Sequence, residues 1–168
     1  MSYINEQLLT SNLTLDSKDL TNDIDNTVKY KLKGQIEKCC HEDGYIIEDS
    51  VKIIKRSIGK VLTNNGKSEI KFLITYKAKL ISPTAGDELS IYINNINKMG
   101  VIGYIKLGIN DVETSEESPL IIMIPREYFE GTSKNIEDLT IGQKLTVEII
   151  GSRIKFRSDK IQAVAKPI

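Results

Sequence analysis

Residues 86–105 contain the pattern that most restricts the fold of this chain. A Gly-Asp pair at Gly86 opens a strand pattern over residues 89–96, a turn follows at residues 97–100, and a second strand contains Gly103. The first strands of a small closed barrel must coil sharply, and a residue without a Cβ tolerates that bend. The pattern therefore predicts that the second half of the chain is a closed β-barrel.

Three further strands are expected in that half, at residues 120–124, 145–149 and 161–165. Pro125 ends the first of them, and residues 126–129 are typical of a single helical turn. Loops are expected at the acidic segment 110–119 and at residues 131–139, with a turn at Gly151. Five strands with a helical plug between the third and fourth predict an all-β OB-fold barrel over residues 83–168.

The first half predicts an α+β domain over residues 1–82. Residues 5–15 resemble a strand, and Asp16 is expected to cap one long helix of about five turns. An apolar stripe at four-residue spacing marks the buried face of this helix: Leu20, Ile24, Val28, Leu32 and Ile36.

The sheet under this helix is expected to be small and antiparallel. Residues 45–62 predict two strands broken near residues 55–57, and Asn64-Asn65-Gly66 predicts a turn. Residues 70–80 alternate apolar and polar side chains more strictly than any other stretch, which predicts a strand with one buried face.

Composition limits the classes of function. The net charge is zero, whereas a wholly electrostatic nucleic-acid binder carries a clear basic excess. Adjacent Cys39 and Cys40 favour a reduced, intracellular chain, in the nucleus or cytoplasm. No leader and no apolar run of about 20 residues is present, so we expect a soluble protein without a membrane partner.

The order of these segments resembles a known family, the larger stalk subunit of multisubunit DNA-directed RNA polymerases. This family includes the seventh subunit of eukaryotic RNA polymerase II and its archaeal counterpart. The segments that carry the resemblance are Leu13–Leu15, Leu32–Ile46, Ile58–Ser68, Ile74–Ala78, Pro83, Gly86–Leu89, Leu145–Gly151 and Ile161–Ala165. Two departures are Asn65, where the family has an acid, and Lys67, which separates Gly66 from Ser68. The Ile-, Lys- and Asn-rich sequence is similar in style to versions encoded by large DNA viruses, which would also place it in the virion.

The resemblance implies a fold and a set of partners. The fold would be an N-terminal tip domain followed by an OB domain. The partners would be the large polymerase core subunits, a small helical stalk partner and, weakly, nascent RNA. The tip loop would dock near the polymerase clamp, with these residues at the contact: Gly44, Tyr45, Gly59, Asn64, Asn65 and Gly66. The alternative for the same residues is a set of ordinary hairpin turns.

RNA is expected on the strand face of the barrel. Tyr92 and Tyr104 can stack on bases, and five cations can meet phosphates: Lys98, Lys106, Arg153, Lys155 and Arg157. Ile154 and Phe156 alternate with the last three cations, which predicts that those cations share one side of a strand. The alternative is a solvated strand face.

Other classes of function find less support in the sequence. His41 is the single histidine, and Cys39-Cys40-His41 lacks further cysteine or histidine ligands for zinc. No nucleophile–base pair or phosphate loop is evident, so the sequence predicts no catalytic site, metal or cofactor. A free-standing OB-fold RNA-binding or translation factor remains the alternative to a polymerase subunit.

Overall fold

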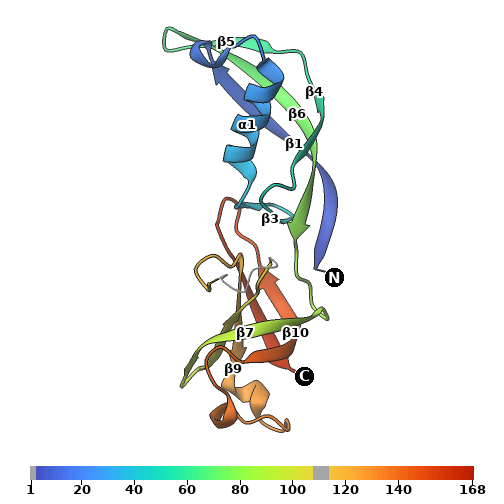
Figure 1. The fold of residues 1–168 in the computed structure, drawn as a ribbon, viewed down its shortest axis with the longest axis vertical. Helices are drawn as coiled ribbons and strands as arrows, with labels where there is room; N and C mark the ends of the chain where they lie inside the picture. Colours follow the sequence, from blue (N-terminus) through green and yellow to red (C-terminus); the bar gives the residue numbers. More distant parts are fainter. Residues whose placement is uncertain (1–2, 108–113) are drawn as a thin grey trace. The chain divides into compact units, whose positions relative to one another are not determined.

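The structure, a computed structural model, describes residues 3–107 and 114–168 (Figure 1). It is mostly β structure, and its contacts divide the chain into two compact units. The helix unit contains Asn5–Lys38 and Ile46–Leu80, and the barrel unit contains Met1–Ile4, Cys39–Tyr45 and Ile81–Ile168. The barrel unit therefore includes a segment, Cys39–Tyr45, that comes from the first half of the sequence.

One long strand, β6 (Lys67–Ile81), organises the sheet that lies outside the barrel. Four strands pair with it: β1 (Ile4–Asp16), β3 (Gly44–Ile46), β4 (Lys52–Arg56) and β5 (Lys60–Asn64). A further short strand, β2 (Cys40–His41), pairs with β3. Residues 44–64 thus hold three strands where the sequence predicted two, and the break before β5 falls at residues 57–59.

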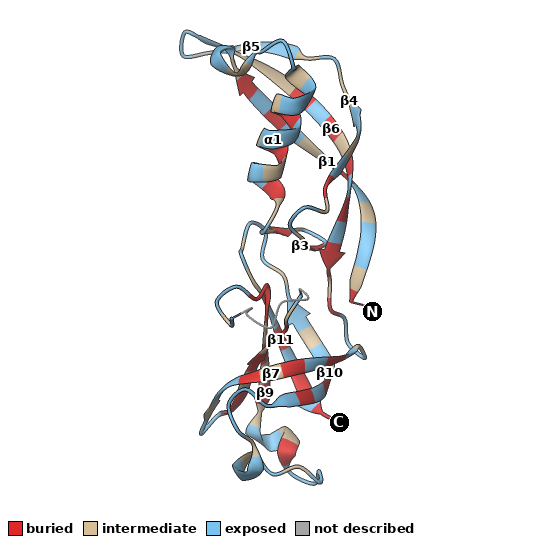
Figure 2. Cartoon of the chain, in the orientation of Figure 1, coloured by how far each residue is buried: buried red, intermediate tan, exposed pale blue. Residues whose placement is uncertain are grey.

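The alternation along β6 is confirmed (Figure 2). The predicted inward side chains are at most 2% exposed from Phe72 to Leu80, whereas Leu73 on the opposite face is 49% exposed. The inward face packs against the helix α1 (Ile24–Ile36), which contributes Val28, Leu32 and Ile36 to the same core. Burial of this apolar surface from both elements stabilises the unit.

The predicted start of the helix is wrong. Asp16 ends β1 and caps only a short 3₁₀ turn, η1 (Ser17–Asp19), because the Asp19 carboxylate accepts the Asp16 backbone N–H at 3.1 Å. The cap of α1 is Asp23, whose Oδ1 accepts the backbone N–H of Asn26 at 3.3 Å. Leu20 lies outside α1 and is 41% exposed, so it does not belong to the buried stripe.

The barrel is closed by five strands in the order β10-β11-β9-β8-β7. They are β7 (Glu88–Asn97), β8 (Gly100–Tyr104), β9 (Leu120–Pro125), β10 (Lys144–Arg153) and β11 (Ile161–Pro167). β9 and β11 are parallel, and the other pairs are antiparallel. The helical turn predicted after β9 is the 3₁₀ helix η2 (Arg126–Phe129), which buries Phe129.

Two glycines of β8 let the barrel close tightly. A Cβ on Gly100, whose φ is +146°, would lie 2.1 Å from the carbonyl oxygen of Ile124 on β9. A Cβ on Gly103 would lie 2.5 Å from Cδ1 of Ile91 in the core. The contact at Gly100 is with backbone that cannot move aside, so this position requires glycine for close packing of the barrel wall, whereas at Gly103 the flexible end of the Ile91 side chain would have to shift.

Three loop expectations meet different outcomes. Gly151 does not turn the chain, because β10 continues to Arg153 with a bulge between Ile149 and Gly151. The segment 131–139 contains a short 3₁₀ helix, η3 (Ile136–Asp138). The acidic loop expected at 110–119 lies partly outside the described residues. Within residues 3–107 and 114–168, no helix is long and apolar enough to cross a membrane.

Candidate nucleic-acid interface

Three of the residues predicted to contact RNA meet on the outer face of the barrel, and we call them the tyrosine site. Tyr92 on β7 and Tyr104 on β8 are direct register partners, and their ring centroids lie 6.0 Å apart with an interplanar angle of 35°. Lys106 places its Nζ 4.5 Å from the centroid of the Tyr92 ring. The site therefore combines two neighbouring aromatic rings with a cation held over one of them.

The alternation of β7 explains why this site faces outward. Ile91 and Ile93 are 0% and 1% exposed in the barrel core, so Tyr92 between them points to the opposite side. Lys144 on β10 is the register partner of Tyr92, and Ile121 on β9 is the register partner of Tyr104. Two half-exposed tyrosine rings beside cations can stack on bases while the cations meet phosphates.

Lys98 is not part of the tyrosine site. It lies in the turn between β7 and β8, where Asn97 Oδ1 accepts the backbone N–H groups of Met99 and Gly100 at 2.9 and 3.2 Å. Tyr104 ends β8 at the other end of this hairpin. At about 3.3 Å per residue the two positions are separated by roughly the length of the strand.

The three remaining cations do not share a strand face, so that prediction is wrong. Arg153 is the last residue of β10 and pairs with Gln162 of β11, whereas Lys155 and Arg157 lie in the following loop. Arg157 adopts a φ of +62°, and its backbone N–H donates to the carbonyl of Cys40 at 2.8 Å. A backbone bond from a segment distant in sequence therefore bends the chain where local alternation predicted a continuing strand.

Phe156 is the exposed member of this loop that sequence reasoning treated as merely apolar. Its side chain is 54% exposed, and the Arg157 guanidinium carbon lies 5.4 Å from its ring centroid. The signal that marks it is local: an aromatic residue placed between Lys155 and Arg157. Stacked arginine and aromatic side chains are a frequent feature of nucleic-acid surfaces.

The residues predicted to dock a polymerase do not form one loop. Tyr45 is only 7% exposed, so its side chain packs inside the protein and is not an exposed anchor. Gly44 is also buried, since a Cβ on it would lie 2.5 Å from the carbonyl oxygen of Ile81. Ile47 donates its N–H to the carbonyl of Lys79 at 3.0 Å, which places this segment at the C-terminal end of β6.

The other predicted docking residues are associated with the opposite end of β6. Asn65 and Gly66, with φ of +50° and +76°, form the two-residue turn between β5 and β6, flanked by Asn64 and Lys67. Gly59 lies just before β5, and a Cβ there would approach Ile70 Cγ2 to 2.6 Å. Asn65 and Gly66 are exposed, and the side chain of Asn64 lies outside the described part of the chain.

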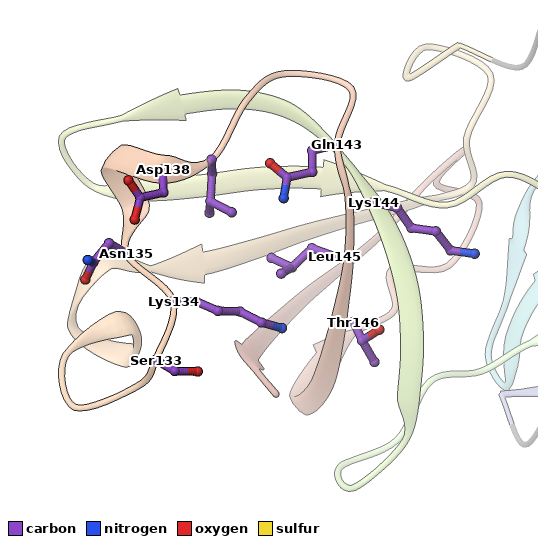
Figure 3. Close-up of a pocket in the computed structure, with 9 residues that line it drawn as sticks. Ser133, Lys134, Asn135, Asp138, Gln143, Lys144, Leu145 and Thr146 are labelled. Carbon is purple, nitrogen blue, oxygen red and sulfur yellow. The ribbon is translucent and has the colours of Figure 1, made fainter.

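A polar pocket of about 320 Å³ in the barrel unit includes Lys144, the register partner of Tyr92 (Figure 3). Its lining consists of Ser133, Lys134, Asn135, Asp138, Leu139, Gln143, Lys144, Leu145 and Thr146. Lys134 extends past Leu145 toward Thr146, and its Nζ contacts the carbonyl of Ile168, whereas the Lys144 ammonium points away from Lys134. As far as the structure describes it, the lining contains no histidine that could act as a general base and no histidine or cysteine that could bind a metal ion.

The two cysteines are free thiols, Cys40 buried and Cys39 half-buried. Burial raises the pKa of Cys40 to about 11, with the neighbouring Cys39 and Asp159 adding to the effect, and burial also raises the pKa of Cys39. His41 Nδ1 is buried, and the nearest carboxylate oxygen, on Asp43, lies 3.9 Å away, which is too far for a hydrogen bond. Among the described residues, no group of three or more His, Cys, Asp or Glu side chains could hold a metal ion.

Comparison with known proteins adds little to these observations. No protein-family profile matches the sequence, and no curated protein matches it. Among solved structures, the uncharacterized protein MJ1198 from Methanocaldococcus jannaschii is similar over 52% of this chain and 93% of its own, with 18% identity and a TM-score of 0.34. A similarity this weak does not bear on function, so the function must be derived from the residues themselves.

Proposed function

We propose that this chain is a non-catalytic stalk subunit of a DNA-directed RNA polymerase. In this proposal residues 1–82 form the tip domain that docks near the polymerase clamp, and residues 83–168 form an OB-fold domain that guides emerging RNA. The observation that carries the proposal is the tyrosine site, where Tyr92, Tyr104 and Lys106 meet on the outside of a closed barrel.

The connectivity of the barrel supports an OB fold. Its strands close in the chain order first, second, third, fifth and fourth, with the third and fifth parallel. A short helix, η2, stands between the third and fourth strands. A five-stranded Greek-key barrel of this kind binds oligonucleotides on the face of its second and third strands. Tyr104 lies on the second of these strands, and its partner Ile121 lies on the third.

The exposed end of the helix unit supports a docking role. Ile58 is 94% exposed and Val61 is 66% exposed, and both lie close in sequence to the Asn65–Gly66 hairpin. Large apolar side chains that remain this exposed favour a protein contact. Because Tyr45 is buried, we assign docking to this end, which we call the hairpin end, and define it by Ile58, Val61, Asn65 and Gly66.

The proposal is tested by two variants with opposite expected effects. A tagged chain is purified gently from its native source, the bound proteins are identified by mass spectrometry, and RNA is crosslinked in parallel. Ile58→Asp with Val61→Asp should lose the two largest polymerase subunits and keep RNA crosslinking. Tyr92→Ala with Tyr104→Ala should keep the polymerase and lose the crosslink, since each stacked base contributes about 1–3 kcal/mol.

The wild-type result separates this function from its alternative. Recovery of the large polymerase subunits in equal amounts, with or without a small helical partner, supports the stalk role. Ribosomal proteins or bulk RNA without polymerase would replace it with a free-standing RNA-binding factor. Circular dichroism of each variant shows whether a lost contact merely reflects a lost fold.

A further inference from the structure

The loop between β10 and β11 is held in place by a segment from elsewhere in the barrel unit. The backbone N–H of Cys40 donates to the carbonyl of Ser158 at 2.7 Å, and the N–H of Arg157 donates to the carbonyl of Cys40 at 2.8 Å. Ser158 also closes the loop on itself, since its N–H donates to the carbonyl of Lys155 at 3.0 Å and its hydroxyl to that of Lys160 at 2.9 Å. The backbone of this loop is therefore fixed before any ligand arrives.

The fixed loop presents an ordered group of side chains. Phe156 is 54% exposed, the Arg157 guanidinium carbon lies 5.4 Å from its ring centroid, and the His41 ring lies edge-on at 6.1 Å with an interplanar angle of 72°. The aromatic ring is thus oriented by two neighbours while more than half of its side chain remains accessible. A large aromatic side chain left exposed in a fixed orientation is typical of a binding surface.

The charges around Phe156 indicate the kind of ligand. Arg153, Lys155 and Arg157 are exposed on this loop or at its start, and Asp159 is the acidic residue of the same stretch. An excess of cations disfavours a basic or strongly apolar partner and favours a polyanion. An aromatic face beside cations matches single-stranded nucleic acid, whose bases stack while its phosphates pair with the cations.

We propose that Phe156 and Arg157 form a second base-stacking platform for single-stranded nucleic acid, here called the loop platform. The identity of that nucleic acid as nascent transcript rests on the proposed function; the platform itself does not. The barrel would then hold one strand at two points, the tyrosine site and the loop platform.

Strand register connects the tyrosine site to Arg153, the end of β10, from which the loop with Phe156 and Arg157 continues. Tyr104 pairs with Ile121, Ile121 pairs with Gln162, and Gln162 pairs with Arg153, so one row of outward positions crosses from β8 to β10. Neighbouring strands lie about 4.8 Å apart, which makes the row roughly 14 Å long. A single strand of about four nucleotides or more, the usual footprint on an OB fold, can span it.

The test measures oligouridylate binding to the full chain by fluorescence polarisation. Phe156→Ala should weaken binding of an oligonucleotide of about twelve nucleotides by about fivefold or more, the loss of one stacked base. Tyr30→Ala is the matched control, because Tyr30 is 81% exposed and lies on α1 in the helix unit. The platform would be overturned if Phe156→Ala bound this oligonucleotide with an affinity within about twofold of wild type.

Salt dependence separates stacking from charge. Lys155→Ala should lower the slope of log affinity against log salt by about 0.7, the value for one phosphate contact on a single strand. Phe156→Ala should leave this slope unchanged while lowering affinity at every salt concentration. A lower slope in Phe156→Ala would mean that the residue only positions cations, which contradicts a stacking role.

The platform and the polymerase role can fail separately. If no polymerase is recovered with the wild-type chain but oligouridylate binding still depends on Phe156, the loop platform stands and the stalk function is lost. If Phe156→Ala loses polymerase subunits and keeps full oligouridylate affinity, the loop is a protein contact and the platform is overturned.

Discussion

Replacing Gly100 with alanine tests how tightly the barrel wall closes. The added Cβ would lie 2.1 Å from the carbonyl oxygen of Ile124 and 3.0 Å from the Cα of Pro125. These are backbone atoms of a paired strand, so relief requires a shift of β8 against β9, and such overpacking costs about 1–3 kcal/mol. The φ of +146° adds strain of roughly 1–3 kcal/mol for a residue with a side chain. We expect a total loss of about 4 kcal/mol.

That loss is large against the total stability of a domain, about 5–15 kcal/mol. Each kcal/mol lowers the melting temperature of a domain of 60–100 residues by about 4–8 °C, so Gly100→Ala should melt at least about 15 °C below wild type. Thermal unfolding followed by circular dichroism measures this shift. Gly151→Ala is the control, because a Cβ at Gly151 meets nothing within 4 Å and should change stability little. Equal melting temperatures for the two variants would refute the reasoning about close β8–β9 contact.

Two further predictions concern ionisable groups. Burial, with Cys39 and Asp159 adding to the effect, raises the pKa of Cys40 to about 11. Ellman's reagent at about pH 8 should therefore modify half-buried Cys39 before buried Cys40. Equal rates of modification at the two thiols would contradict this prediction. The Lys31 ammonium, 2.6 Å from Asp19, lowers the pKa of that carboxyl by its hydrogen bond. The resulting stability is present above about pH 4 and is lost as pH falls through the lowered pKa. The urea midpoint of Asp19→Asn should therefore fall less on acidification than that of the wild-type chain. If both chains show the same pH profile, the Asp19–Lys31 ion pair does not contribute to stability.

Patterns carried by neighbouring residues predicted the strands well. The alternation over residues 70–80 correctly gave the buried face of β6, since side-chain direction in a strand follows directly from sequence position. The Gly-containing hairpin at residues 86–105 correctly predicted the first two strands of a closed barrel. In both cases the signal and the structure it specifies lie within a short stretch of sequence.

Errors arose where two local solutions competed. Asp16 and Asp23 both suit a helix cap, and the apolar spacing continues back to Leu20. The structure uses both aspartates, one for a 3₁₀ turn and one for α1, because the Asp19 carboxylate bonds the backbone of Asp16. Sequence spacing alone does not rank two caps of similar strength.

In the candidate site, too, local patterns predicted some residues correctly and long-range packing decided others. Tyr92 and Tyr104 were predictable as a pair because a hairpin turn sets their register. Tyr45, which the resemblance placed at the docking contact, is buried, and its burial depends on packing that its neighbours in sequence do not reveal. Phe156 was overlooked for a related reason: the bend that exposes it is imposed by Cys40, which lies far earlier in the sequence.

The hydrogen bonds between Cys40 and the β10–β11 loop link the first half of the sequence to the barrel unit. Cys39–Tyr45 lies between two stretches of the helix unit in sequence, yet it belongs to the barrel unit. A fragment beginning at Pro83 would leave Arg157 N–H and the Ser158 carbonyl without the Cys40 partners that orient them. Pre-organisation lowers the cost of binding, so in the proposed platform the first half of the sequence would contribute to nucleic-acid binding by orienting the loop without touching the ligand. In the proposed function, residues 1–82 would then both dock through the hairpin end and, through Cys40, hold the β10–β11 loop of the barrel unit.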